Sequence, residues 1–368
     1  MQLRAERTFY LIGFVLLAVA PWLVSPYNLS LLGRFLAYAI VALGLVLVWG
    51  EAGILSLGQG LFFGLGGYVL AMYLKLVNLA PGDLPDFMQW SGISHLPAWW
   101  AIFRNPVIAT LGVAAVPAAV AAAFAWLVFH RRVGTVYFAL ITQAMVLAFV
   151  TLLSSEQGYT GGFNGLTDFH TLYGLSLDSQ SVQNGLYWAT VAALAASFIG
   201  LKWLTGSHFG KLLRALSDSE NRVRFLGYDS MPYKTIAFVI GAALAGIGGA
   251  FFTLQAGVIS PAGIGVVSSI EMVVWVAVGG RRSLAGAIVG TLVVNFAQEM
   301  VSNAFPNVWP FAIGLMFILV VTLLPSGLGG LFRPEALAAL RARLRRLSGA
   351  AGLIPMADDP GRDMRGVK

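Results

Sequence analysis

Cysteine is absent from this sequence of 368 residues, and charged side chains are scarce. Without cysteine, the chain has no disulfide, no thiolate metal site and no cysteine nucleophile. Charged residues form 11% of the sequence, whereas an ordinary soluble domain carries roughly 25%. Hydrophobic residues form 58%, and the mean hydropathy is +0.79. This composition excludes a soluble globular domain and predicts an integral membrane protein.

Histidine is also scarce, and no catalytic motif is found. The four histidines lie in loops or at the ends of apolar runs, without the spacing of paired metal ligands: His95, His130, His170 and His208. No G-x-S-x-G nucleophile motif is present. The stretch Gly206–Lys211 resembles a phosphate-binding loop, but its spacing is one residue short and Leu212 replaces the required Ser or Thr. The sequence therefore predicts no enzyme, no metal and no bound cofactor.

Apolar runs of about 20 residues, the length that crosses a bilayer as a helix, recur along the chain. They predict an all-α protein with about ten transmembrane helices, over Phe9–Val24, Leu31–Trp49, Leu61–Leu79, Pro106–Phe129, Val136–Leu153, Gly185–Leu204, Thr235–Gly257, Val266–Val278, Leu284–Val301 and Val308–Leu324. Ala18-Val19-Ala20 resembles a signal-peptidase site, but Pro21 directly after it disfavours cleavage. We therefore treat the first run as a span.

Basic residues predict the orientation, because cytoplasmic loops carry an excess of lysine and arginine. With the amino terminus inside, 20 of the 23 Lys and Arg lie on the cytoplasmic side, the exceptions being Arg34, Lys75 and Arg104. Arg34 and Lys75 are expected near outer span ends, where they can reach the interface. Both termini are then cytoplasmic, and the net charge of +7 reflects this asymmetry rather than nucleic-acid binding.

Residues 1–331 are predicted to form one polytopic membrane domain, followed by a separate tail. Pro334–Leu347 places leucines on one face and arginines elsewhere, which predicts a basic amphipathic helix lying on anionic membrane lipid. The remainder, Gly349–Lys368, is expected to be disordered.

The polar segment, Gly206–Lys234, is an internal stretch rich in charges of both signs. Phe209, Leu212, Leu213 and Leu216 follow the spacing of one helix face, which predicts a short amphipathic helix. Ser217 and Glu220 are spaced as a capping box that starts a second short helix, and Gly227 is placed to end it. We therefore expect two small helices on the cytoplasmic side, where a solvated loop is the alternative.

Polar groups within the apolar runs are candidates for a translocation path, because ionisable or amide side chains at membrane depth are costly and often functional. The candidates are Glu271, Asn295, Gln298, Gln143 and Gln255. They could instead join helices to one another. Gly53-Ile54-Leu55-Ser56-Leu57-Gly58-Gln59-Gly60 is too rich in glycine for a continuous membrane helix, and predicts a broken or re-entrant segment shielded by neighbouring helices.

Several of these stretches resemble the permease subunits of ATP-binding-cassette importers of the branched-chain amino acid type. The resemblance covers about Leu31–Leu331 and rests on Gly53–Gly60, Tyr137–Gln143, Asn221–Tyr228 and Ser269–Arg281. Within the family, the chain is most similar to the urea-importer branch, on Leu84–Met88, Thr160–Phe169 and Phe305–Pro310. The resemblance thus implies an importer of urea or a short amide.

The resemblance also implies the partners. It places this chain in the bacterial cytoplasmic membrane, beside a second, different permease subunit. It also implies two cytoplasmic ATPases, which bind and hydrolyse the ATP that this chain does not bind, and a periplasmic solute-binding protein. The polar segment would then dock on an ATPase, and the residues expected to couple the two are Arg214, Ser217, Asp218, Glu220, Asn221, Arg222 and Gly227.

Three other functions remain open from the sequence. The same class of importer could carry branched-chain amino acids. An ion-coupled secondary transporter would use Glu271 as a relay, although such a carrier has no need of a structured cytoplasmic docking segment. A membrane enzyme is disfavoured by the missing catalytic motifs.

Overall fold

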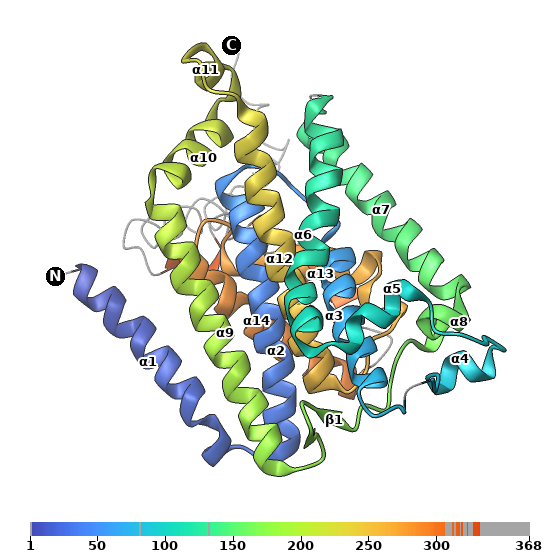
Figure 1. Ribbon diagram of the computed structural model, residues 1–368. Coiled ribbons are helices and arrows are strands. Elements are labelled where there is room, and N and C mark those ends of the chain that lie inside the picture. Colours follow the sequence, from blue (N-terminus) through green and yellow to red (C-terminus); the bar gives the residue numbers. More distant parts are fainter. Residues whose placement is uncertain are drawn as a thin grey trace, which may run out of the picture.

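A computed structural model describes residues 2–80, 82–131, 133–305 and, beyond these, residues 311–312, 314–316, 318, 322 and 327–331. The described part is almost entirely helical, which confirms the predicted all-α membrane protein (Figure 1). In this part, six helices are long and apolar enough to cross a membrane: Pro26–Glu51 (α2 Pro26–Leu45 continued by the π-helix η1 Val46–Glu51), α6 Pro106–His130, α7 Thr135–Ser155, α9 Gln180–Gly206, α12 Ser230–Ala256 and α14 Leu284–Ala304.

Helices are also found at three further expected spans. They are α1 Gln2–Leu23, α3 Gln59–Leu76 and α13 Val266–Gly279. The apolar part of α1, Gly13–Leu23, and the whole of α13 are shorter than a full crossing. The last expected span, Val308–Leu324, falls largely outside the described residues, and the predicted tail, 332–368, lies wholly outside them.

The centre of the bundle is formed by α2, α3 and α12, which pack closely because glycine lines their contacts. A methyl group on Gly66 of α3 would overlap the backbone of Gly246 in α12, and one on Gly249 would overlap the carbonyl oxygen of Phe63. Small residues allow membrane helices to approach each other this closely. The resulting van der Waals contacts supply packing energy that the hydrophobic effect cannot supply within lipid. The most apolar 18-residue stretch of Pro26–Glu51 is 83% buried inside the bundle, whereas the corresponding stretches of α6 and α7 are each 28% buried.

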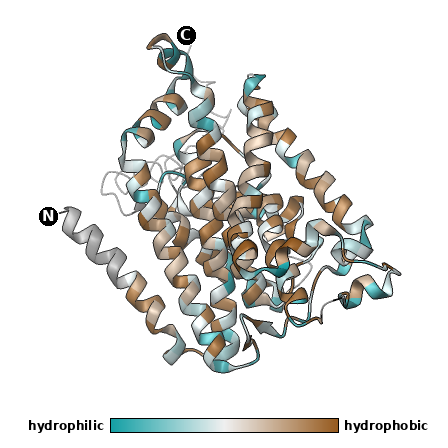
Figure 2. Cartoon of the chain, viewed as in Figure 1, coloured by the Kyte–Doolittle hydropathy of each residue, from teal (hydrophilic) through white to brown (hydrophobic). Residues whose placement is uncertain are grey.

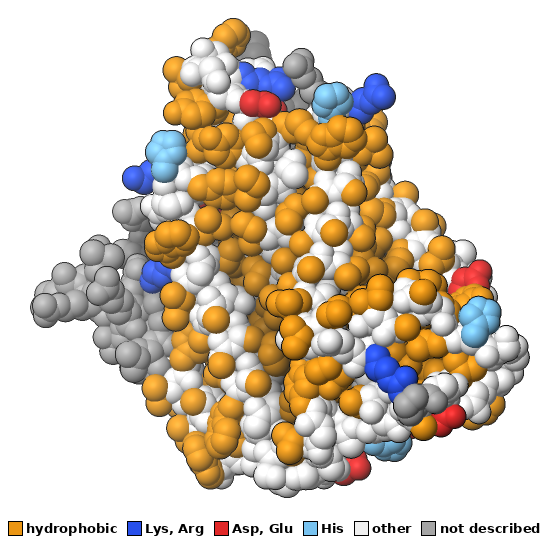
Figure 3. All heavy atoms as spheres, in the orientation of Figure 1, with side chains coloured by type: hydrophobic (Ala, Val, Ile, Leu, Met, Phe, Trp, Pro, Cys, Tyr) orange, Lys and Arg blue, Asp and Glu red, His pale blue; other side chains and the backbone are white. Residues whose placement is uncertain are grey.

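The outside of the bundle carries a broad apolar belt, with polar residues gathered at its two ends (Figures 2 and 3). One end, which we call the basic end, comprises α10 His208–Asp218, α11 Glu220–Phe225, the α6–α7 turn and the α13–α14 turn. The opposite end, the loop end, comprises α4 Asp86–Trp90, α5 Ala98–Ala101, η2 Ile102–Arg104, α8 Gln157–Thr160, η3 Gly162–Asn164, β1 Thr171–Leu172 and β2 Leu175–Ser176. The short helices η4 Pro261–Ile264 and α16 Leu328–Leu331 complete the described chain.

The two long loops at the loop end pack against each other instead of extending freely. The Trp100 indole donates to the Tyr159 carbonyl at 2.9 Å, and the Thr171 hydroxyl donates to the Asn78 side chain at 2.6 Å. Lys75, at the end of α3, binds Asp86 of α4 at 3.1 Å. This end is therefore a packed cap.

Candidate functional site

The polar segment folds as two short helices, α10 and α11, which protrude from the basic end of the bundle (Figure 1). The apolar face predicted for α10 is confirmed, since Leu212, Leu213 and Leu216 are buried. Leu212 and Leu216 pack with Val223 of α11 and Tyr233 of α12. The segment is thus a folded element mounted on the bundle.

Arg214 fixes α10 to the π-helix η1. Its guanidinium donates to both carboxylate oxygens of Glu51, and its Nη2 also donates to the Thr205 carbonyl at 3.3 Å. Glu51 is 6% exposed, so Arg214 supplies the counter-charge that a buried carboxylate requires. Arg214 was expected to contact an ATPase, and in the structure it forms an ion pair within its own chain while about half of its side chain stays exposed.

Ser217 and Asp218 hold the same helix at two further points. Ser217 lies against Gly53, where the backbone has a φ of +71° and an added Cβ would lie 2.6 Å from the Ser217 hydroxyl. Asp218 accepts a 3.1 Å bond from Arg282 in the α13–α14 turn. A displacement of α10 would therefore change contacts both with the segment after η1 and with the α13–α14 turn.

The predicted capping box is wrong. Ser217 lies inside α10, and α11 begins after Ser219, whose side chain makes no capping bond. The Glu220 carboxylate instead accepts bonds from Lys234 and Ser230 of α12, both at 2.6 Å. A charge-assisted bond to an ammonium is stronger than one to a backbone N–H, so the carboxylate turns toward α12. Gly227, with a φ of +88°, follows α11 and is consistent with its predicted ending.

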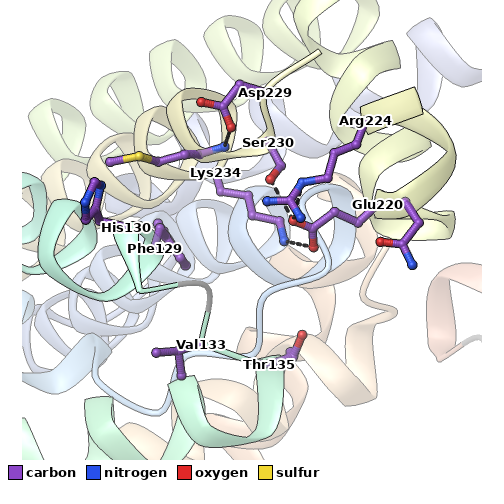
Figure 4. A pocket seen from close by; sticks show the side chains of 12 residues that line it. Phe129, His130, Val133, Thr135, Glu220, Arg224, Asp229, Ser230 and Lys234 are labelled. Carbon is purple, nitrogen blue, oxygen red and sulfur yellow. Dashed lines mark hydrogen bonds and ion pairs between the residues drawn. The ribbon is translucent and has the colours of Figure 1, made fainter. Parts of the chain in front are cut away.

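A cleft of about 400 Å³ lies beside Glu220, between the α6–α7 turn and the start of α12 (Figure 4). His130 and Thr135 line one side, and Glu220, Asn221 and Arg224 line the other. Burial of the Glu220 carboxylate opposes its ionisation, but the bonds from Lys234 and Ser230 outweigh burial, so the pKa of Glu220 lies below its ordinary value. Glu220 is therefore an anionic anchor between α11 and α12.

The tip of the polar segment exposes large apolar side chains that the sequence analysis did not single out. Phe225 is 91% exposed and Leu226 is 76% exposed, beside the exposed Asn221 and Arg222. Large apolar side chains that are exposed on a folded polar element are typical of a protein-binding surface. The signal in the sequence was an apolar pair directly before Gly227 in an otherwise charged stretch.

The five candidates for a translocation path do not share one environment. Gln255 is buried and joins helices, because its side chain donates to Thr190 of α9 at 3.4 Å and packs on Gly33 of α2. Asn295 is also buried and donates to Thr291 within its own helix. Gln143, Glu271 and Gln298 are half-buried.

Glu271 belongs to a cluster of charged and aromatic groups on α2 and α13. The Tyr38 ring lies 4.6 Å from that of Trp275, and Tyr38 is within electrostatic reach of both Glu271 and Arg34. Arg34 lies about 12 Å along α2, which begins at Pro26, and its Nε is buried. Half-buried charges within apolar helices favour surroundings of protein or water rather than lipid.

The predicted broken segment is confirmed between η1 and α3. Hydroxyl groups bind its backbone: the Leu57 amide donates to Thr142 of α7 and the Gly60 amide to Ser269 of α13, both at 3.1 Å. The Gly58 amide donates to Ser56. Gln59, which had no predicted role, lies between Gly58 and Gly60 in this arrangement and is fully buried.

Comparisons with known proteins agree with this architecture. A family profile described as "Branched-chain amino acid transport system / permease component" matches residues 27–324. The chain is 25% identical over 353 residues to the high-affinity branched-chain amino acid transport system permease protein LivM of Escherichia coli (strain K12), covering 90% of this chain and 76% of the relative. It is 26% identical over 313 residues to BraD of Pseudomonas aeruginosa, covering 81% and 92%.

LivH of Salmonella typhimurium, another high-affinity branched-chain amino acid transport system permease protein, is 24% identical over 313 residues, covering 81% of this chain and 92% of the relative. No solved structure matches the chain. The profile match extends over most of the described helices, from α2 to α14. The chain therefore belongs to the family of permease components of branched-chain amino acid transport systems.

Proposed function

We propose that this chain forms, with a second permease subunit, the membrane path of an ATP-binding-cassette importer. Family membership supports the transport role, and the observation that carries the ATP-driven mechanism is the exposed Phe225–Leu226 tip on a folded cytoplasmic mount. The chain works with two cytoplasmic ATPases and a periplasmic solute-binding protein. The loop end receives the binding protein, and the basic end faces the cytoplasm.

In this proposal, α10 acts as a lever. Closure of the ATPases moves the tip, and the ion pairs Arg214–Glu51 and Asp218–Arg282 carry that movement to η1 and to the α13–α14 turn. Both contacts reach elements that continue into the membrane, so a displacement at the tip changes helix positions there. This is the coupling that alternating access requires.

Two solutes have specific support. The names of LivM, LivH and BraD favour branched-chain amino acids. The outer stretches Leu84–Met88 and Thr160–Phe169 favour urea through their resemblance to the urea-importer branch. Solute choice depends on a few side chains grafted on a shared fold, so relatives of about one-quarter identity establish the class of transporter more firmly than the solute.

Uptake in cells that lack this subunit decides between the two solutes. Radiolabelled leucine and radiolabelled urea are supplied separately, with and without the restored gene. Restored leucine uptake with unchanged urea uptake establishes the amino acid, and the reverse establishes urea. Restoration of neither contradicts both solute assignments.

A further inference from the structure

Gln59 is the first residue of α3 and directly follows the broken segment. Its side chain is 0% exposed. Within the described part of the chain, neither its Nε2 nor its Oε1 has a hydrogen-bond partner. A buried amide with both ends unsatisfied is destabilising, so its presence calls for a reason other than folding.

The surroundings of Gln59 show that polar groups are satisfied here wherever the fold itself needs them. Ser56, Thr142 and Ser269 are all 0% exposed, and each hydroxyl accepts a bond from a backbone amide of the segment. Gly60 lies so close to Ile264 and Ser269 that no side chain fits there. The three hydroxyls are thus engaged, whereas the neighbouring amide of Gln59 keeps a donor and an acceptor unused.

Gln255 provides the contrasting case in the same bundle. It too is a buried glutamine in a membrane helix, but it binds Thr190 and lies against Gly33, so it joins three helices. A glutamine retained for structure is bonded in this way. Gln59 differs in the one property that matters for binding, which is unused hydrogen-bonding capacity.

We propose that the Gln59 amide is a hydrogen-bonding contact for the solute during translocation, an inference that rests on the proposed transport function. Its unused groups complement a small molecule that presents an N–H donor beside a carbonyl or carboxylate oxygen. Urea and the head group of an amino acid share this chemistry. Irregular backbone at membrane depth is tolerated where it is buried in protein or lines a transport pathway, and the segment before Gln59 is irregular.

The test compares Gln59→Met with Gln255→Met in the complete importer, reconstituted with its ATPases and binding protein. Methionine has nearly the shape of glutamine without its polar atoms. The inference predicts that Q59M lowers the maximal rate of ATP-driven uptake roughly tenfold or more, the loss expected for one buried hydrogen bond. The concentration of solute at half-maximal rate stays unchanged, because the binding protein sets capture. The thermal unfolding temperature of Q59M stays level or rises, since two unsatisfied atoms are removed.

Q255M is the structural control and is expected to lower the unfolding temperature, because the bond between Gln255 and Thr190 is lost. Uptake by Q59M at the wild-type rate overturns the inference, and so does a loss of uptake accompanied by a lower unfolding temperature. Uptake is measured separately with labelled urea and with labelled leucine, which shows which of the two solutes presents the group that binds Gln59. A wild-type complex that imports neither solute contradicts both solute assignments of the proposed function, whereas wild-type transport that survives in Q59M overturns only the role of Gln59.

Discussion

Glu51 and Arg214 show how one contact joins a buried charge to a surface helix. The carboxylate is nearly buried, whereas the guanidinium is about half exposed. The two single substitutions should therefore differ in their effect on stability. Arg214→Ala leaves a buried, unpaired carboxylate, whereas Glu51→Ala leaves an arginine that water can reach. We expect R214A to lower the free energy of unfolding by about 2 kcal/mol and E51A by less. Thermal unfolding of the purified subunit measures both, and equal losses would contradict the assignment of Glu51 as the buried partner.

Glu220 gives a prediction for pH. Its pKa is lowered in the folded state, so the stability that it contributes is fully present above the pKa of a free glutamate, about 4.3, and is lost as the pH falls through the lower folded value. The carboxylate is 38% exposed, so this contribution is at most about 1 kcal/mol. The stability difference between wild type and Glu220→Gln should be constant from neutral pH to mild acid and shrink below that. A difference that persists in strong acid would contradict the ion pair with Lys234.

At the scale of the element, α11 should act through its exposed tip. The double substitution Phe225→Asp and Leu226→Asp removes apolar side chains that are mostly exposed, so the subunit should keep its stability. Co-purification of the ATPases and ATP-driven uptake should both fall at least tenfold, as for the loss of an interface anchor. Phe163→Asp is the matched control, because Phe163 is 73% exposed at the opposite end. Equal loss of ATPase binding in both variants would reject the tip as the docking surface.

The contact between α3 and α12 gives a prediction for packing. Gly66→Ala would place a methyl group on the backbone of Gly246, and the helices would have to separate. We expect a loss of about 1–3 kcal/mol in stability or a failure to insert stably. Gly200→Ala in α9 is the control, since no described atom lies within 4 Å of the added methyl group. Comparable unfolding temperatures for the two variants would contradict the close approach of α3 and α12.

Element positions follow from the sequence far better than contacts do. The hydropathy of the chain predicts each membrane helix in the described residues, because burial in a bilayer requires an apolar run of fixed length. The pairing of Arg214 with Glu51 was not predictable, since the two residues are 163 positions apart and meet only through the fold. The capping box failed for the same reason: Lys234 and Ser230 compete for Glu220 from the next helix. The unsatisfied amide of Gln59 likewise becomes visible only once its neighbours are placed.

At the scale of the whole molecule, the basic end and the loop end divide the work. The basic end holds α10, which is bonded to η1 and to the α13–α14 turn, and the loop end is a packed cap, where we propose that a solute-binding protein docks. Between them, the apolar helices α13 and α14 carry the half-buried polar residues Glu271 and Gln298. This arrangement suits a subunit that conducts a solute while the energy enters from outside the membrane.

The source of energy is the central claim, and one uptake measurement tests it most directly. Cells that express the full importer are loaded with labelled solute after either ATP depletion or treatment with a protonophore. The account predicts that uptake stops when ATP is depleted and continues when the proton gradient alone is removed. Uptake that survives ATP depletion but collapses with the protonophore would contradict it, and would instead identify an ion-coupled carrier.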